Sequence, residues 1–439
     1  MLFLINLEPH SVVQKKELTV MRTRCFSVAV LLVAGAVLLW PAVAAAELKV
    51  GINGSIKLDL QYNTRRFDLN TGPAAVPLDV DTTKASTTEN VIRDRRDNGE
   101  TKFDARESRF TITAADKISN VAMKGLIEVD FYGEDAEGNV LTFGSRGPRL
   151  FHAFAQADVP MGMNTGYLLI GQTWSYFQNS DIAVPTTVDF NGPAGQLYAR
   201  QPQLRIGMNI PLDSNNTITF GASVQQQSFS SSSNLTNAFN EAQGHGQDVP
   251  LFALKGQWLQ EMGYKGEVAF AVSRARFAQD NFPTAGRTAT ASETVWGVQY
   301  SGSYNFGPIE PFLHLQYLSG LNREANGDFV DVAARIVTLD SRLDITAIRT
   351  WGGYAGFGYK FTPNTSFNTV FGFNQAFSER DFDFIDAVFK KHRSIHANVM
   401  HNFWERWRVG FEYQRFWVKT FNGQTGDVNV FHTGVWFFF

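Results

Sequence analysis

Alternation of apolar and polar residues with a period of two is the feature of this sequence that most constrains its fold. In the first such stretch, Ile52, Ile56 and Leu58 fall on one face. Lys57 and Asp59 fall on the other face. Alternation over about four to eight residues is typical of a β-strand with one apolar and one polar face. The same pattern recurs along most of the chain, and it predicts an all-β protein.

About sixteen alternating segments can be counted, each of about ten residues or more. They are expected at 49–62, 103–114, 120–132, 149–158, 165–172, 197–210, 216–226, 250–260, 263–276, 292–305, 309–321, 346–361, 364–378, 391–403, 407–420 and 427–439. Short connectors alternate with long ones, and the long ones are 63–102, 133–148, 173–196, 227–249, 277–291, 322–345 and 379–390. This alternation predicts a transmembrane antiparallel β-barrel of about 16 strands, with short periplasmic turns and long external loops.

A large secreted β-sandwich is the soluble alternative, because its strands also alternate. Two observations favour the membrane barrel. Aromatic residues make up 13% of the chain and crowd the ends of the predicted strands, as at Tyr62, Phe131 and Trp258. Such aromatic girdles mark the two membrane interfaces. The polar face of nearly every strand also carries charged or amide side chains, which fits a water-filled lumen better than a dry core.

The N-terminal region predicts export. A short basic stretch after Met21 precedes an apolar run from Phe26 to Leu39, and an Ala-rich site follows the run. These are the three parts of a secretory signal peptide, whereas a transmembrane anchor would need about 20 apolar residues. We expect residues 1–46 to be an upstream extension plus signal peptide, with Met21 as the true start and cleavage before Glu47. Residues 47–439 are then a single barrel domain.

Composition and motifs exclude several other functions. The formal net charge is −3, without the basic excess of a nucleic-acid binder. The single Cys leaves with the leader, so the mature chain has no disulfide. His392 and His396 share a strand face, and we expect no acidic or thiol partner beside them, so solvated or lumenal histidines are expected rather than a metal site. No nucleophile elbow is present. The sequence therefore predicts no cofactor, no metal and no enzyme.

Two connectors have unusual composition. The loop 63–102 contains Asp79, Asp81, Asp94 and Asp97, which predict either a cation site or an ordinary solvated loop. The connector 173–196 includes Trp174, Tyr176, Asp181 and Asp189, and the two aspartates are its only charges. It is too apolar for an exposed loop and too rich in Gly and Pro for a strand. We therefore expect this third external loop to fold into the lumen and narrow the channel.

Three segments resemble a known family. Leu168–Phe177, Asp189–Gln196 and Arg200–Arg205 look like the corresponding parts of the DcaP-like family of trimeric outer-membrane porins. Phe103–Phe110 and Glu128–Gly133 are similar to the second and third strands of that family. The resemblance implies a homotrimer of channels, each of about 16 strands, in a Gram-negative outer membrane. It also implies passage of small hydrophilic solutes, often anionic ones such as dicarboxylates. The coiled-coil extension of some relatives is absent, because Glu47 leads directly into the first strand.

Strand parity predicts which charges face the lumen. The cations are Lys57, Arg109, Lys124, Arg205, Lys255 and Arg408, and the carboxylates are Asp59, Glu107, Glu128, Asp130, Glu267 and Glu412. Because the two signs are equally frequent, the count does not predict whether the channel prefers cations or anions. The preference depends on which charges lie at the constriction, and alternation does not give their depth in the channel. Anion preference rests on the resemblance alone.

Arg109 and Arg205, which flank the inward loop in sequence, are the candidates for an anion-attracting cluster, since guanidinium groups bind carboxylates. Arg200, in the matched segment, is a further candidate for the lining of the pore. The alternative is that Arg109 and Arg205 pair with wall carboxylates and only stiffen the barrel.

The function predicted from these observations is passive diffusion through an outer-membrane porin. The partners expected are outer-membrane lipid, small solutes and further copies of the same chain. A structural or adhesin-type barrel and an outer-membrane hydrolase are the alternatives. The first would have a plugged lumen, and the second would need a catalytic constellation at the rim or outer wall. The identity of the solute and the strands of the trimer contact stay open.

Overall fold

The computed structural model describes residues 48–65, 76, 98–133, 147–179, 181–190, 192–227, 231–232, 249–280, 288–325, 331–337, 342–377, 389–421 and 423–439. The compact unit that contains them is Leu48–Phe439. The expected signal peptide lies outside the described residues and stays a prediction, as do the start at Met21 and cleavage before Glu47. Asp79, Asp81, Asp94 and Asp97 of the loop 63–102 also lie outside them. Among the described residues, no helix is long and apolar enough to cross a membrane.

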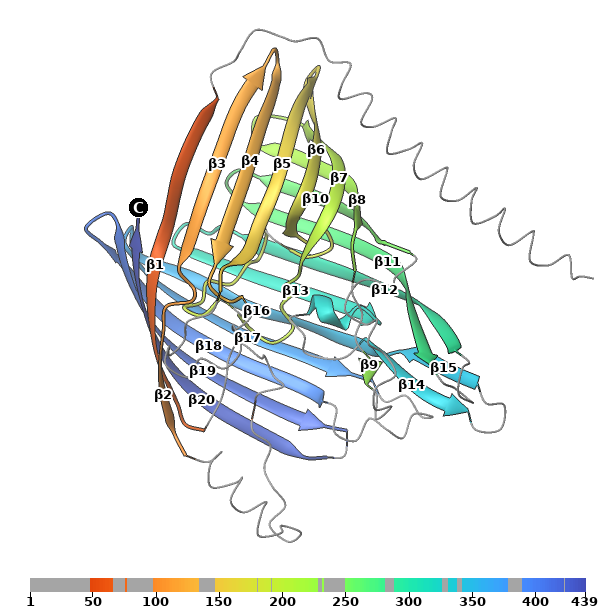
Figure 1. The fold of residues 1–439 in the computed structure, drawn as a ribbon. Helices are drawn as coiled ribbons and strands as arrows, with labels where there is room; N and C mark the ends of the chain where they lie inside the picture. Colours follow the sequence, from red (N-terminus) through yellow and green to blue (C-terminus); the bar gives the residue numbers. More distant parts are fainter. Residues whose placement is uncertain are drawn as a thin grey trace, which may run out of the picture. The chain divides into compact units, whose positions relative to one another are not determined.

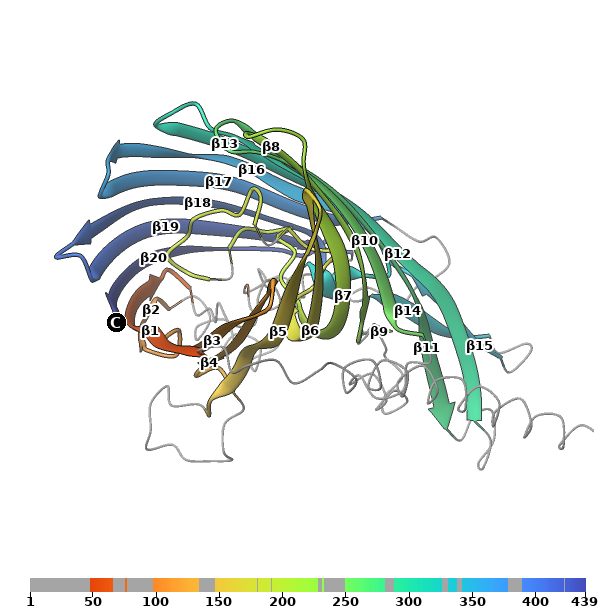
Figure 2. The ribbon, with the colours of Figure 1, turned by 90° about the horizontal axis from the view of Figure 1, so that it is seen from above.

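The wall is one antiparallel sheet that closes on itself (Figures 1 and 2). Its strands are β1 (Lys49–Asn63), β2 (Glu100–Asp104), β3 (Arg109–Ile118), β4 (Val121–Asp130), β5 (Arg149–Met161), β6 (Asn164–Trp174), β7 (Arg200–Pro211), β8 (Asn216–Gln225), β10 (Leu251–Gln260), β11 (Tyr264–Asp280), β12 (Thr288–Tyr304), β13 (Ile309–Ser319), β16 (Arg349–Thr362), β17 (Thr365–Ala376), β18 (Phe389–Phe403), β19 (Trp407–Thr420) and β20 (Thr425–Phe438). The sheet has 17 strands, but β2 and β3 pair with successive parts of β1 and occupy one position, so the wall has 16. The predicted fold class is confirmed.

The barrel closes where the first strand meets the last. In this seam β1 and β20 run antiparallel, with Lys57 opposite Trp436 and Asn63 opposite Val430. Backbone hydrogen bonds between Gly54 and Phe439 extend the pairing to the final residue. Closure leaves no unpaired sheet edge, which the hydrocarbon interior of a membrane would not tolerate.

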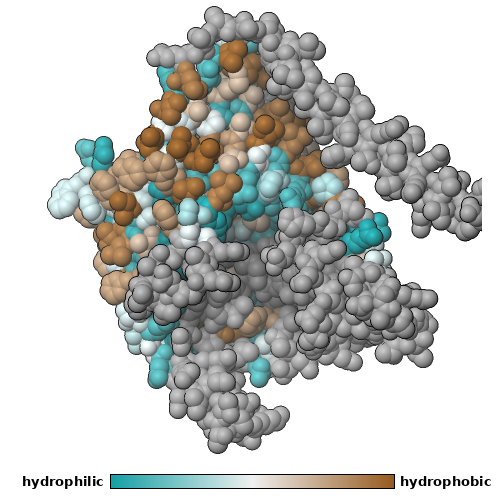
Figure 3. Space-filling model, viewed as in Figure 1, coloured by the Kyte–Doolittle hydropathy of each residue, from teal (hydrophilic) through white to brown (hydrophobic). Residues whose placement is uncertain are grey.

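The period-two pattern places apolar side chains outside and polar ones inside. On β1, Ile52 is 63% exposed and Ile56 58%, whereas Lys57 and Asp59 are each 1% exposed. Figure 3 shows apolar side chains, in brown, gathered on the outer face of the strands in the upper half of the view. An apolar outer wall and a polar interior are what a membrane barrel requires.

Short turns join the strands at the end of the barrel where β1 begins. Gly162 and Gly307 have φ of 68° and 77°, a left-handed conformation that glycine adopts without a steric cost. In the turn Leu212–Asn215, backbone N–H groups of Asn215 and Asn216 donate to Asp213 and lower the pKa of its carboxyl. The strand ends that lead into the long connectors lie at the opposite end of the barrel, as predicted.

Apart from shifts of a few residues at strand ends, the structure differs from the predicted strands in two places. The segment 103–114 is interrupted at Ala105–Ser108, because Asp104 turns to bind Arg106 and Ser108 accepts the Lys57 backbone N–H. The connector 322–345 is not structureless. It begins with the 3-10 helix η3 (Asn322–Glu324) and contains β14 (Val332–Val337) and β15 (Arg342–Ala347), which form a second sheet with β9 (Ser231–Ser232).

Candidate functional site

The connector between β6 and β7 folds into the barrel. Its described residues, within 175–199, include the buried side chains Phe177, Ile182, Val188 and Leu197. Figure 2 shows this segment crossing the interior of the ring of strands. We call it the constriction loop. The predicted inward fold is therefore found, with β6 extending through Trp174 before the loop begins.

The root of the loop packs on the wall formed by β10 to β13. Phe177 and Leu197 join an apolar cluster with Leu251, Leu318 and small alanines of these strands. A Cβ at Gly297 would lie 2.9 Å from the Phe177 ring, so the glycine makes room for it. Burying one such side chain contributes about 1.5–3 kcal/mol. The composition of the loop could indicate that these side chains are buried, but not which strands they pack against.

A buried lysine also holds the root. The Lys255 ammonium donates to the carbonyl of Gln178 and lies 3.4 Å from the Glu267 carboxylate. Gln225 of β8 accepts the Tyr176 backbone N–H at 2.9 Å. Lys255 is thus fixed between the wall and the loop rather than open to the channel.

The tip of the loop is clamped at Val188 by two opposite charges. The Lys57 ammonium donates to the Val188 carbonyl at 2.7 Å, and the Val188 N–H donates to the Glu412 carboxylate. Gly410 and Gly434 leave room for the Val188 side chain, since a Cβ at either would lie 3.0 Å or less from it. We call these contacts the Val188 clamp.

The Val188 clamp belongs to a buried charge network in the wall. Lys57 is 2.9 Å from Asp59 and also pairs with Glu107. The Asp59 carboxylate contacts His432 at 2.6 Å, and Glu412 contacts His396 at 2.8 Å. The expectation that His396 has no acidic neighbour is therefore wrong, because antiparallel pairing brings Glu412 of β19 beside it.

The returning arm of the loop lies against β16 to β18. The Ala194 N–H donates to the Ser394 hydroxyl at 2.8 Å. Gly195 has φ of 78°, and a Cβ there would lie 2.3 Å from the Phe373 carbonyl oxygen. Only glycine fits such a close backbone approach. The loop is thus held at its root, tip and returning arm.

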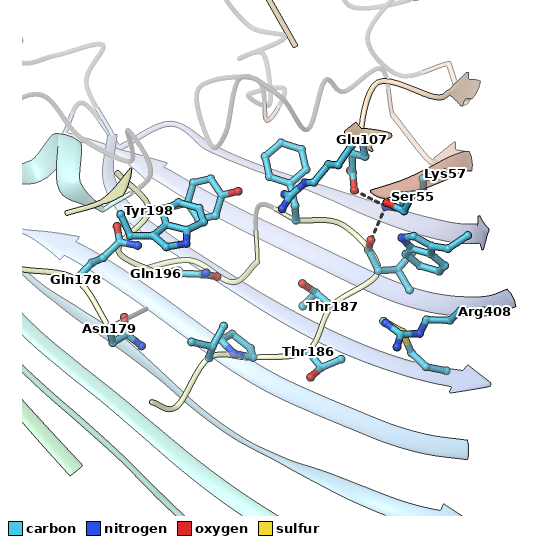
Figure 4. Close-up of a pocket in the computed structure, with 18 of the residues that line it drawn as sticks. Ser55, Lys57, Glu107, Gln178, Asn179, Thr186, Thr187, Gln196, Tyr198 and Arg408 are labelled. Atoms are coloured by element: carbon cyan, nitrogen blue, oxygen red, sulfur yellow. Dashed lines mark hydrogen bonds and ion pairs between the residues drawn. The ribbon is translucent and has the colours of Figure 1, made fainter. Parts of the chain in front are cut away.

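A cavity of about 380 Å³ lies between the constriction loop and the wall (Figure 4). Lys57, Glu107 and Arg408 come from the wall, while Gln178, Gln196 and Tyr198 come from the loop; Figure 4 labels all six. Arg109 and several aromatic side chains complete the lining, including Trp174, Phe190, Trp436 and Phe438. Aromatic, amide and guanidinium groups therefore face one water-accessible space.

Beside this cavity, arginines surround the buried ring of Phe151. The guanidinium carbons of Arg200 and Arg109 lie 3.8 and 3.9 Å from its centroid, and that of Arg149 lies 6.0 Å away. Arg109 pairs with Glu128 at 3.2 Å, and Arg149 pairs with Asp130 at 2.6 Å. Arg200 makes no ion pair with a described carboxylate.

Arg205 and Arg408 also lack a carboxylate partner among the described residues. Arg205 donates to the Gln203 side chain at 2.8 Å and to the Trp174 carbonyl at 2.9 Å, over the Tyr176 ring. Arg408 donates to Asn402 at 2.8 Å and lies over Phe438. These hydrogen-bond partners are neutral, so neither guanidinium forms an ion pair with a described carboxylate.

The predicted pore-lining residues thus take different places. Lys57 and Lys255 are buried under the loop, and Asp189 is buried within it. Asp181 and Lys124 are exposed. Lys124 lies near the beginning of β4, close to the short turn that joins β3 to β4. Arg109 and Arg205 do not share one cluster, because Arg109 lies over Phe151 and Arg205 over Tyr176.

Sequence reasoning missed Arg149. A register shift in β5 sets Glu128 opposite His152 but Val129 opposite Leu150, with Phe151 between them. Such a bulge changes the parity of the strand, so simple alternation cannot assign both of its halves. The register that pairs Arg149 with Asp130 places it on the lumenal face.

A closed antiparallel barrel with an apolar outer wall, a charged interior and one inward loop is the architecture of an outer-membrane channel of Gram-negative bacteria. Solved structures share this fold. The outer membrane channel DcaP of Acinetobacter baumannii matches with a TM-score of 0.66 and 18% identity, over 89% of this chain and 97% of that one. OmpT of Vibrio cholerae, an outer membrane protein, matches with a TM-score of 0.53 and 12% identity, over 90% and 100%. A trimer form of OmpT matches with a TM-score of 0.51 and 12% identity, over 89% and 99%.

At these identities the comparisons establish the fold. They agree with the resemblance to the DcaP-like family in architecture. No protein-family model and no curated protein sequence matches the chain.

Proposed function

We propose that this protein is a porin, a water-filled channel for passive diffusion of small hydrophilic solutes, and that it prefers anions such as dicarboxylates. The fold and the inward loop support the channel. The observation that carries the anion preference is the state of the lumenal arginines. Arg200, Arg205 and Arg408 have neutral partners, whereas the lumenal carboxylates Glu128, Asp130 and Glu107 are paired with cations.

This difference supports a preference for anions, which the equal numbers of lumenal cations and carboxylates left open. The field of a carboxylate in an ion pair is largely cancelled by its cation, while a guanidinium outside an ion pair attracts an anion over several ångströms. Guanidinium groups also offer two parallel N–H donors to a carboxylate. Aromatic rings beside Arg200 can contact the apolar part of an organic anion.

A homotrimer in outer-membrane lipid completes the proposal. The trimer form of OmpT shows that a chain of this fold assembles in threes. The family resemblance implies the same assembly. Chemical cross-linking of the protein in detergent, followed by denaturing electrophoresis, tests it through the largest species formed.

Planar-bilayer recording tests the channel and its selectivity together. The purified protein should give stepwise conductance, and a potassium chloride gradient should give a reversal potential of the sign that anion preference requires. Adding a small dicarboxylate should reduce chloride current by competition. A bilayer with no conductance would favour the structural or adhesin-type barrel. A reversal potential of the sign expected for cation preference would contradict the anion preference but not the channel.

A further inference from the structure

The helix η3 touches both ends of the constriction loop. The carbonyl of Glu324 accepts the Tyr198 N–H at 2.7 Å, near the end of the loop. The Glu324 carboxyl accepts a hydrogen bond from Gln201 of β7 at 2.6 Å and reaches the hydroxyl of Ser175, where the loop begins. The Ser175 N–H donates to the Ala199 carbonyl at 2.8 Å, so the two ends are also joined to each other. One residue, through its carboxyl and its backbone carbonyl, thus connects the beginning and the end of the loop with η3, which lies more than 120 positions further along the chain.

The surroundings of this carboxyl favour its neutral form. Glu324 is 0% exposed, and its contacts with Ser175, Gln201 and Gln227 are neutral groups. The charged group that acts on it is Asp331, which precedes β14, and the titratable Tyr198 contacts its backbone. No ion pair joins Glu324 to a described cation. Burial raises the pKa of the Glu324 carboxyl to about 7, with a smaller increase from Asp331, against the lowering effect of the three hydrogen-bond partners.

We propose that Glu324 is a positioning residue for the constriction loop, whose neutral carboxyl latches both ends of the loop and whose ionisation loosens them. The inference rests on the proposed channel function, because it concerns the regulation of the same constriction. When the proton leaves for the external water, a buried anion remains beside Asp331, and no cation of the described part of the chain is paired with it. A buried uncompensated charge is costly, so η3 and the loop ends separate more often to admit water.

The sign of the effect follows from linkage. A carboxyl whose pKa is raised in the folded state binds its proton more tightly when the latch is closed, so the closed latch is most stable in acid. That stability is lost as the pH rises through about 7. Between pH 6 and pH 8 the ionised fraction of such a group rises from about one tenth to about nine tenths. Loop opening should therefore increase by up to about ninefold over this interval.

Single-channel recording of the whole protein from pH 5.5 to pH 8.5 tests the latch. In the natural protein, the frequency of current fluctuations should rise through neutral pH. Glu324→Gln should remain quiet at every pH, because the amide cannot ionise but keeps the size of the side chain. Glu261→Gln, which changes an exposed carboxylate in a short turn, is the matched control and should behave as the natural protein. A Glu324→Gln channel that keeps the natural pH dependence would overturn the inference.

Hydrogen exchange in detergent micelles provides a second test that needs no variant. After correction for intrinsic base catalysis, protection of the Tyr198 amide should fall as the pH passes through neutral. Protection of the Ala194 amide, which donates to Ser394 in the returning arm, should stay constant. Equal behaviour of the two amides would contradict the latch. Since exchange does not depend on ion flow, a failed latch and a failed channel function give different results.

Discussion

Two kinds of cation line the interior of this barrel, and their environments differ. Lys57 and Lys255 are 1% and 5% exposed, bind carboxylates of the wall, and donate to carbonyls of the constriction loop. Arg200, Arg205 and Arg408 lie over aromatic rings and have neutral hydrogen-bond partners. The alternation of each strand predicted that both lysines, Arg205 and Arg408 face the lumen, and it gave no reason to treat these four charges differently. Arg200 was not among the charges predicted in this way. Pairing, rather than orientation, therefore separates the lysines that hold the loop from the arginines that we propose to act on a solute.

Removing a loop-holding lysine should have the largest effect. Lys57→Met leaves Asp59 and Glu107 without their cation and Val188 without its donor, and breaking a buried pair costs about 3–5 kcal/mol. We expect a lower melting temperature and a larger, noisier single-channel conductance, because the loop tip is freed. Lys124→Met, at an exposed lysine, is the control. Natural stability and conductance in Lys57→Met would show that the two kinds of cation are not distinct.

Removing two arginines should change selectivity without loosening the loop tip. A unit charge about 7 Å from a solute in water contributes about 0.6 kcal/mol, so each arginine should account for about twofold or more in anion permeability. Arg200→Ala combined with Arg205→Ala should move the reversal potential toward cations under a salt gradient. Arg274→Ala, at an exposed position of β11, should leave it unchanged. An unchanged potential in the double variant would remove these arginines from the selectivity of the channel.

Releasing a paired arginine should produce a smaller shift of opposite sign. Glu128→Gln removes the carboxylate that lies 3.2 Å from Arg109, and the guanidinium then acts on the lumen without compensation. The reversal potential should move toward anions by about half the displacement of the double arginine variant, since one charge changes instead of two. Glu261→Gln again serves as the control. A shift toward cations would mean that the pairing argument has the wrong sign.

Keeping the charge while changing its shape should have the smallest effect. Arg205→Lys retains a cation but loses the planar group that donates to both Gln203 and the Trp174 carbonyl. The reversal potential should stay close to that of the natural protein, and affinity for a dicarboxylate blocker should decrease modestly. A shift as large as that of Arg205→Ala would show that geometry, and not charge alone, sets the selectivity.

The wall could be predicted because each strand carries its own signal. Alternation depends on neighbours in sequence, and β18, expected at 391–403, is found at Phe389–Phe403. The inward loop was also predictable, since low charge and aromatic side chains are local features. The contacts that anchor this loop to the wall could not be predicted. The Val188 clamp joins positions 131 apart, and no periodic pattern relates Glu324 to Ser175 or Tyr198.

Parity likewise has a definite limit. It assigns a face, but it says nothing of depth or partner, so Lys57 and Arg408 look alike in sequence. A β-bulge makes the assignment from alternation wrong beyond it. The register shift at Phe151 is such a case, and Arg149 was missed for this reason. Strand parity and a position beside the inward loop made Arg205 a candidate, and Arg200 lies in the segment that resembles a porin family. Only the structure could show that their hydrogen-bond and ring contacts are neutral.

The seam between β1 and β20 has a consequence for biogenesis. Its partners are far apart in the chain, as Asp59 and His432 are separated by 373 positions. The ribosome therefore completes every other strand before the pairing that closes the ring can form. Until then any sheet that the preceding strands form has two unpaired edges, which are prone to aggregation. Deletion of β20 would leave the same two edges permanently, and such a chain should be degraded rather than inserted.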